Sequence, residues 1–311
     1  MTAIEAKGLK KHFGKTSALV DVSFSVPTGA VYALIGANGA GKSTLIQLLM
    51  NMLEPTEGHA WMAGTPVSEL FGARLNKIGY ISEEQRWPEW MTIKRLLAYL
   101  RPFYPTWDPM LEERLLHEFD LPVDCKLKNL SRGMRMKVAF VSSLSYRPSV
   151  IVLDEPLSGL DPLVRDELVD SLQKLQREAT GFTAFLSSHD LGEIESFATH
   201  VGFLERGRIL FSEEMGSLKN RFRKVTFASV NTLAAGMPPE WLQPEATGTA
   251  LTFIHSNFDE ASIQEEVTAL YPDARDIATE NLPLRAIFLV TAKAGRRSAS
   301  REELDIRREQ A

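Results

Sequence analysis

At Gly36-Ala37-Asn38-Gly39-Ala40-Gly41-Lys42-Ser43-Thr44 the chain carries the phosphate-binding pattern G-x-x-x-x-G-K-[ST]. An apolar run at residues 31–35 precedes the pattern and another follows at residues 45–50, so it lies between a predicted strand and a predicted helix. Glycines let the backbone turn its N–H groups inward around a polyphosphate, and the start of the helix adds its positive dipole end. We therefore expect Lys42 to reach the β- and γ-phosphates of a nucleotide, and the Ser43 hydroxyl to ligate Mg²⁺.

The composition is that of an ordinary globular protein. The 311 residues, 44% of them hydrophobic, suffice for one large domain or two smaller ones. The net charge of −5 with 24% charged residues gives no reason to expect a nucleic-acid partner. Cys125 is the single cysteine and cannot form an intrachain disulfide, which agrees with a reducing cytoplasm.

The sequence contains no predicted membrane span. No apolar run approaches the roughly 18–20 residues that a bilayer requires. The longest run, residues 138–144, is interrupted by Ser142 and Ser143. The N-terminus lacks a basic stretch followed by an apolar core, so no secretory signal is predicted.

The order of predicted strands and helices indicates an α/β core. Residues 4–35 read as strands separated by turns, and residues 150–153 form an unbroken apolar run of the kind buried in a parallel sheet. Later segments alternate helix, strand and helix at residues 162–179, 183–187 and 191–199. Helical periodicity replaces the strand pattern at about residues 86–148. We therefore predict a helical subdomain inserted into a parallel sheet that helices cover.

Beyond residue 220 the pattern changes, and residues 221–294 read as a small α+β appendix. The predicted elements are strands at 225–230, 250–254 and 286–290, a loop at 235–248 and a helix at 259–270. Residues 295–311 mix arginine with glutamate and contain few apolar side chains. That composition favours a flexible charged tail over a basic partner-binding one.

Two carboxylates end the apolar run at residues 150–153. Asp154 follows it directly and fits the Mg²⁺-side aspartate that pairs with Ser43. Glu155 lies one residue further on, where it can polarise the water that attacks a γ-phosphate. An ordinary strand-end turn would also explain this pair, but a position downstream of a phosphate loop favours the catalytic interpretation.

With these motifs in this order, residues 4–220 resemble the ATP-binding subunit of ABC transporters. The resemblance implies a P-loop NTPase core of the ABC ATPase type at residues 1–220, with an antiparallel β subdomain. The family's L-S-G-G-Q signature corresponds here to Leu130-Ser131-Arg132-Gly133-Met134. It implies that Ser131 and Gly133 contact the γ-phosphate held by the opposite subunit. Arg132 and Met134 depart from the signature, and we expect function to survive both changes.

Three further residues match family positions. Asp161, in Ser158-Gly159-Leu160-Asp161, corresponds to the D-loop that lies across the dimer interface. His189 corresponds to the switch histidine that contacts the γ-phosphate. Phe13 corresponds to the aromatic residue that stacks on adenine, a contact that suits any π-face.

The family's Q-loop glutamine has two candidates in this chain. Its side-chain oxygen reaches Mg²⁺ directly or through water. Glu83 occupies the position by its spacing from Gly79, and Gln85 lies two residues later. We favour Glu83 as the metal-side residue and keep Gln85 as the alternative.

The resemblance implies an ATP-hydrolysing motor subunit. Two such subunits, identical or closely paralogous, close head to tail around two ATP–Mg²⁺ and drive separate transmembrane permease subunits from the cytoplasmic, inner face of the cell membrane. The variant signature and the appendix look most like the type-two ABC exporter group. The alternatives are a soluble ABC-type ATPase of DNA repair or translation and a module that uses ATP only as a switch. The single phosphate loop, the lack of a long heptad run and the intact Glu155 argue against them.

Overall fold

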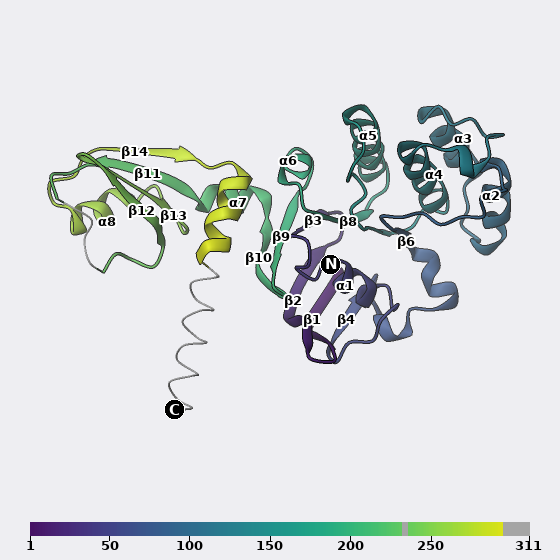
Figure 1. Ribbon diagram of the computed structural model, residues 1–311, viewed down its shortest axis with the longest axis horizontal. Coiled ribbons are helices and arrows are strands. Elements are labelled where there is room, and N and C mark those ends of the chain that lie inside the picture. The colour runs from purple at the N-terminus through teal and green to yellow at the C-terminus, as the bar shows by residue number, and fades with distance from the viewer. Residues whose placement is uncertain (232–235, 295–311) are drawn as a thin grey trace. The chain divides into compact units, whose positions relative to one another are not determined.

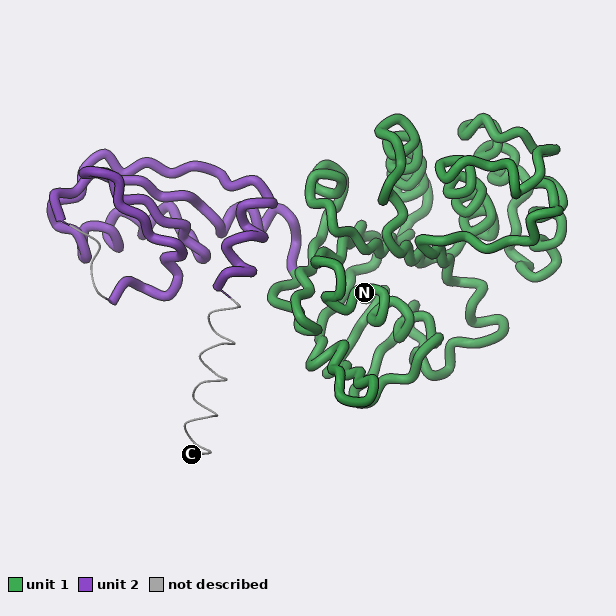
Figure 2. Tube along the Cα trace, viewed as in Figure 1, with its two compact units in different colours: residues 1–212 green, residues 213–311 purple. Residues whose placement is uncertain are grey.

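The computed structural model describes residues 1–231 and 236–294 and divides the chain into two compact units (Figure 2). The first unit spans Met1–Ser212, and the second begins at Glu213. The division precedes the boundary predicted at residue 220, so that α7 (Met215–Arg221) belongs to the second unit. The predicted charged tail, residues 295–311, lies outside the described residues.

One mixed sheet organises the first unit (Figure 1). In sheet order its strands are β5 (Thr65–Pro66), β4 (Glu57–Met62), β1 (Thr2–Phe13), β2 (Thr16–Pro27), β10 (Arg208–Glu214), β9 (His200–Glu205), β3 (Val31–Ile35), β8 (Thr183–Ser188), β7 (Val150–Leu153) and β6 (Ile78–Ile81). The four strands from β5 to β2 pair antiparallel. The five strands from β9 to β6 pair parallel. The sheet therefore joins the predicted antiparallel β subdomain to a core of parallel strands.

Burial differs between the two parts of the sheet. Along β2, buried and exposed residues alternate, as expected of an antiparallel strand with one face toward water. Every residue of β3, β7 and β8 is buried, as expected of parallel strands that are covered on both faces. The rings of Phe24, Tyr32 and Phe185 pack in this core with centroids 5.4–6.0 Å apart. Their packing joins β2 to the parallel strands.

The α-helices of the first unit are α1 (Lys42–Leu49), α2 (Ile93–Leu100), α3 (Pro109–Glu118), α4 (Arg132–Leu144), α5 (Pro162–Glu178) and α6 (Leu191–Ile194). Helices α2, α3 and α4 group beyond the β6 edge of the sheet, within the segment predicted as the helical insertion (Figure 1). α6 ends before the predicted limit at residue 199. The backbone N–H and the hydroxyl of Thr199 donate to the Val31 carbonyl of β3, so the chain joins the sheet at this residue.

The second unit is an antiparallel sheet with helices. Its strands, in sheet order, are β12 (Trp241–Thr247), β13 (Ala250–His255), β11 (Arg223–Ala228) and β14 (Arg275–Asn281). Its helices are α7, α8 (Ile263–Leu270) and a helix over residues 284–294. Aromatic side chains, among them Phe227, Phe253 and Tyr271, form its core. Within residues 1–231 and 236–294, no helix in either unit has the length and apolar character that crossing a membrane requires.

The strand predicted at residues 286–290 is wrong, because this segment is helical. Leu284, Ile287 and Val290 are buried at a spacing of three, which is a helix period and not a strand period. β12 lies within the segment predicted as a loop, and β14 was not predicted. β12 is an edge strand with a register shift near Pro244, a position where a sheet tolerates proline.

Candidate functional site

The candidate site lies where three neighbouring parallel strands end. β3 pairs with β8 and β8 pairs with β7, and each strand runs into a loop that carries predicted site residues. The carboxyl ends of parallel strands form the usual ligand crevice of open α/β sheets. A cavity of about 570 Å³ opens there, lined by the phosphate loop together with Glu83, Glu155, Ser158 and His189.

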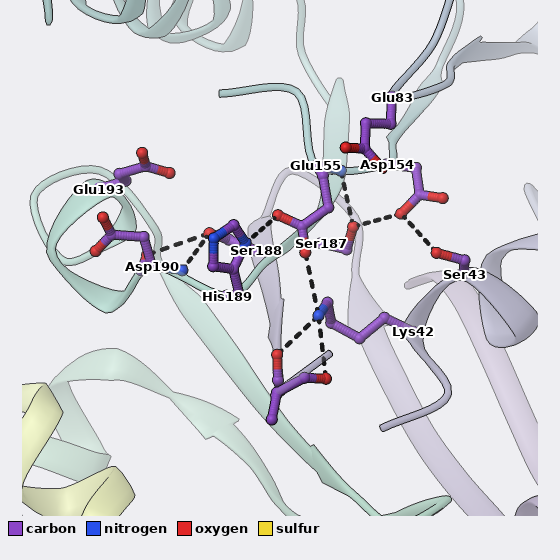
Figure 3. Close-up of polar contacts among 12 residues, drawn as sticks. Lys42, Ser43, Glu83, Asp154, Glu155, Ser187, Ser188, His189, Asp190 and Glu193 are labelled. Atoms are coloured by element: carbon purple, nitrogen blue, oxygen red, sulfur yellow. Dashed lines mark hydrogen bonds and ion pairs between the residues drawn. The ribbon is translucent and has the colours of Figure 1, made fainter. Parts of the chain in front are cut away.

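Lys42 is the buried cation of this cavity, with 6% of its surface exposed. Its ammonium donates to the carbonyl oxygens of Gly36 at 2.7 Å and of Ala37 at 3.4 Å. It also lies 3.1 Å from Glu155 Oε1 (Figure 3). A phosphate oxygen would form a charge-assisted contact with the same ammonium, in exchange for these contacts.

The phosphate loop follows a backbone path that glycine adopts without strain. Gly39 has φ of 80° and Gly41 has φ of 109°. A Cβ atom on Gly41 would lie 2.7 Å from the carbonyl oxygen of Ala18, so a side chain is excluded there. Gly41 is also the N-cap of α1, and no described side chain caps the first turn of that helix. The N–H groups at the start of α1 are therefore suited to an anion.

Glu155 connects Lys42 to His189. Its Oε1 faces the lysine, and its Oε2 lies 2.8 Å from His189 Nδ1 (Figure 3). The residue has φ of 48°, a left-handed conformation that is uncommon for glutamate and concentrates at functional sites. Its side chain is only 11% exposed. The carboxylate is therefore held between two basic groups with little access to water.

Asp154 and Ser43 present oxygen ligands of the kind that coordinate Mg²⁺ in proteins. Ser43 Oγ donates to Asp154 Oδ1 at 3.4 Å, and the Asp154 side chain is buried (Figure 3). Mg²⁺ typically binds one or two protein oxygens and completes its shell with water and substrate phosphates. A hydroxyl and a carboxylate beside a phosphate cavity fit that requirement.

Ser187 is a site residue that the sequence did not reveal. Its hydroxyl donates to Asp154 Oδ1 at 2.7 Å and accepts from the backbone N–H of Glu155 at 2.9 Å. The residue is fully buried at the end of β8. One hydroxyl thus fixes both acidic residues. The available signal was a serine inside a buried strand two positions before His189.

The surroundings of the site shift the pKa of two neighbours. Burial raises the pKa of Tyr80, and the Asp154 carboxylate raises it further. Burial also raises the pKa of Glu193, against the opposing effect of Arg165, whose guanidinium lies 2.7 Å from Glu193 Oε1. The Glu193 carboxylate is therefore poorly solvated, which strengthens its electrostatic interaction with Arg165.

Phe13, the predicted adenine-stacking residue, ends β1 and is 49% exposed. The Lys11 ammonium lies 5.1 Å from its ring centroid. Phe13 does not line the phosphate cavity, whereas Thr16, Ser17 and Ala18 do. An exposed ring at this edge can stack on a base whose phosphates lie in the cavity.

Ser131 and Gly133 of the signature, and Asp161 of the D-loop, do not line the cavity of their own chain. Ser131 caps α4, its Oγ accepting a backbone N–H of the first turn at 3.2 Å. Asp161 caps α5 in the same way at 3.1 Å. A Cβ atom on Gly133 would lie 3.3 Å from the Val164 side chain, so the start of α4 packs closely on α5. The structure does not bring these residues to Lys42 of the same chain.

The two Q-loop candidates occupy different places. Glu83 lines the phosphate cavity. Gln85 lines a neighbouring groove instead, and its amide donates to the Ser82 carbonyl at 2.8 Å. This placement favours Glu83 over Gln85 as the group nearest a bound metal.

Comparisons with known proteins agree on one family. The family model described as ABC transporter matches residues 19–158. The "Lantibiotic transport ATP-binding protein SrtF" of Streptococcus pyogenes is 34% identical over 222 residues, which cover 70% of this chain and 93% of the relative. The "Bacitracin transport ATP-binding protein BcrA" of Enterococcus faecalis is 31% identical over 225 residues, which cover 72% and 73%.

Solved structures point the same way. A structure described as the ATP-binding subunit of an ABC transporter is 29% identical to this chain. It superposes with a TM-score of 0.64 and covers 70% of this chain and 92% of its own. A nucleotide-free ATP-binding cassette from an ABC transporter is 26% identical, with a TM-score of 0.59 and coverages of 69% and 92%.

Proposed function

The chain belongs to the ATP-binding subunits of ABC transporters, and from this premise we propose how its residues bind and hydrolyse ATP. The protein is an ATPase whose hydrolysis of ATP to ADP and phosphate powers transport. The single observation that carries the residue assignment is the contact of Glu155 with both Lys42 and His189 in one cavity. The alternative of a soluble ATPase for DNA repair or translation is not favoured, because these relatives are transport proteins.

The phosphate loop binds the nucleotide in this proposal. Backbone N–H groups of Gly36–Thr44 and the start of α1 hold the phosphates, and Lys42 turns from Glu155 to the β- and γ-phosphates. Phe13 stacks on the adenine. Support comes from the cavity beside this loop and from the lysine that lies within it.

Glu155 then acts as the general base. Once Lys42 has moved to phosphate, the Glu155 carboxylate can accept a proton from the attacking water. His189, held by Glu155 at Nδ1, presents its Nε2 edge to the γ-phosphate. Ser43 and Asp154, with Glu83 nearby, would hold Mg²⁺, and the bound ion would supply positive charge beside the phosphate oxygens. Ser187 keeps Asp154 and the Glu155 backbone in position.

Each site is completed by a second subunit. Ser131, Gly133 and Asp161 are not at the cavity of their own chain, which supports a head-to-tail dimer in which they reach the partner's ATP. ATP is then buried between two chains, and loss of its γ-phosphate lets them separate. The partner is a second copy or a close paralogue.

The transported compound passes through separate membrane-spanning permease subunits. We infer that the chain sits at the cytoplasmic, inner face of the membrane through these subunits. The relatives named for bacitracin and lantibiotic transport support export as the direction.

Three measurements test the proposal. The full chain should hydrolyse ATP in the presence of Mg²⁺, and Lys42→Ala should lower its ATP affinity at least about tenfold, since the charge-assisted phosphate contacts are lost. Undiminished affinity in that variant would remove the phosphate-loop assignment. The chain expressed in its own host should co-purify from membranes with a multi-span protein, and recovery without one would argue against the permease.

A further inference from the structure

The geometry points to Arg132 as a positioning residue that neutralises Glu83 beside the bound phosphates. The inference rests on the proposed function, because it concerns how the same cavity receives ATP. With Glu83 taken as the Q-loop residue, as its place in the phosphate cavity favours, both residues depart from the family pattern, which has glycine in the signature and glutamine in the Q-loop. The two changes meet in space, since Arg132 Nη2 lies 3.9 Å from Glu83 Oε1.

The arginine at position 132 compensates for the negative charge of the glutamate at position 83. A glutamate in place of the family's glutamine adds a negative charge to a cavity that must accept a polyphosphate. An arginine in place of the glycine adds a positive charge at the start of α4, across the groove from Glu83. Together they leave the local charge as the family pattern has it, whereas either change alone would alter it by one unit.

The other charged residues of this groove have partners of their own. Glu83 and Arg132 line a cavity of about 360 Å³ beside the phosphate site. In the same groove Arg86 pairs with Glu84 at 3.1 Å. Arg135 directs its Nε toward a backbone carbonyl at 3.5 Å. Arg132 is therefore the groove's cation that faces Glu83.

Gly159 makes room for this arrangement. A Cβ atom at Gly159 would lie 2.9 Å from Arg132 Nη1 and 3.2 Å from its Cζ. The guanidinium thus lies against the loop that follows Glu155, in the space that a side chain would take. Gly159 has φ of 65°, which glycine adopts readily. Arg132 therefore touches the D-loop and the Q-loop together, and can hold both in place.

The exposure of the Arg132–Glu83 ion pair indicates whether its loss will affect stability or ATP affinity. Both side chains are about half exposed, at 53% and 54%, and exposed ion pairs add little to folding stability. We expect the effect on nucleotide affinity, because an unbalanced carboxylate acts directly on the incoming phosphate charge. Thermal unfolding of the variants should consequently stay close to that of the wild type.

The test is a double-mutant cycle on ATP binding by the full chain, in EDTA and without hydrolysis. Arg132→Gln removes the charge and keeps good helix propensity at the first position of α4. It should raise the dissociation constant for ATP about three- to tenfold in the wild-type background. In the Glu83→Gln background the same change should alter the constant less than about twofold, because no carboxylate remains to be balanced.

Three controls complete the design. Arg132→Lys keeps the charge and should bind ATP nearly as well as the wild type. Arg135→Gln removes a cation from the same groove whose Nε is directed to the Leu130 carbonyl, and should have a smaller effect than Arg132→Gln. Raising the salt concentration should shrink the loss caused by Arg132→Gln, because salt screens half-exposed charges.

An equal loss from Arg132→Gln in both Glu83 backgrounds would overturn the inference, as would no loss in either. These outcomes are distinct from failure of the proposed function. If the wild-type chain does not bind ATP, or if Lys42→Ala binds it equally well, the phosphate-loop assignment itself fails.

Discussion

The Lys42 ammonium lies 3.1 Å from Glu155 Oε1, and each side chain is about nine-tenths buried. The lysine that should bind phosphate and the carboxylate that should activate water therefore neutralise each other before nucleotide arrives. A buried pair of this kind is costly to break unless another charge replaces the lost partner. The γ-phosphate supplies that charge for Lys42, and His189 remains beside Glu155.

Glu155→Gln should consequently separate binding from hydrolysis. Removal of the base is expected to lower kcat by about 10²–10⁴-fold. ATP affinity should be unchanged or higher, because Lys42 no longer has to break an ion pair with Glu155 before it binds phosphate. Size-exclusion chromatography with ATP and Mg²⁺ should show a trapped dimer.

A matched control for this variant is Glu178→Gln. Glu178 pairs with Arg114 on an exposed face, at 2.9 Å, outside the phosphate cavity. It should leave kcat within about twofold of the wild type, since exposed pairs contribute little. If Glu155→Gln retains near wild-type turnover, its assignment as the base is wrong.

Ser187→Ala should impair the site through its geometry. The loss of one hydroxyl leaves Asp154 and the Glu155 N–H without a partner that both share, at a cost to stability of about 1–3 kcal/mol. We expect kcat to fall about tenfold or more, since general-base catalysis depends on a correctly placed carboxylate. Steady-state ATPase assays and thermal unfolding would measure the two effects.

Ser171→Ala is the matched control for Ser187→Ala. Ser171 is 2% exposed, and within the described residues its hydroxyl oxygen has no hydrogen-bond partner. Its removal should therefore be neutral or stabilising. Equal losses of turnover in the two variants would show that Ser187 has only a packing role.

Local sequence patterns predicted that several candidate site residues follow strands. The phosphate loop, the carboxylates after residue 153 and His189 each follow a strand, and three such strand ends meet in the structure. Ser187 was missed because its role depends on β8 lying beside β7, which no local pattern states. The contact between Arg132 and Glu83 likewise joins residues that are distant in sequence.

The second unit shows where local patterns mislead. Ala286–Val290 is a short apolar run, and length alone does not tell a buried helix segment from a strand. The buried spacing of Leu284, Ile287 and Val290 resolves it as helix. β14 is almost entirely exposed, so it carries no hydrophobic alternation to detect. It is a strand because its backbone pairs with β11.

The Asp108 carboxylate in the helical subdomain should make the free energy of unfolding depend on pH. The backbone N–H of Leu111 and the side chain of Arg147 lower the pKa of Asp108, which caps α3. Because the pKa of Asp108 is lower in the folded protein, its charged form stabilises the fold at pH values above the ordinary pKa of 3.8. This stabilisation is lost as the pH falls through the pKa of the folded state. Asp108→Ala should cost about 1–2 kcal/mol at pH 7.

The difference in free energy of unfolding between wild type and Asp108→Ala should shrink as pH falls below 3.8, because the wild type then loses the interactions of the charged carboxylate. Urea unfolding at a series of pH values would measure it. Asp170→Ala, on the exposed side of α5, is the control and should stay within about 0.5 kcal/mol of the wild type at pH 7. A gap that widens with acid would contradict the assigned direction.

Ser131→Arg tests whether the signature acts on the partner's nucleotide. The arginine side chain should disable the partner's nucleotide site that it faces, and so abolish turnover of the homodimer, while ATP binding by the monomer in EDTA stays intact. The substitution also removes the N-cap of α4, which costs about 1 kcal/mol of stability. Thr92→Arg removes the N-cap of α2 and adds the same charge, so it controls for both effects and should leave turnover largely unchanged.

Mixing two inactive variants makes the test of Ser131 decisive. A heterodimer of Ser131→Arg and Lys42→Ala has one composite site that combines an intact Lys42 from the first chain with an intact Ser131 from the second. If the signature acts across the interface, the mixture should hydrolyse ATP although neither variant does so alone. If each chain works by itself, no combination restores activity, and loss of monomer ATP binding in Ser131→Arg would place the residue at its own chain's site instead.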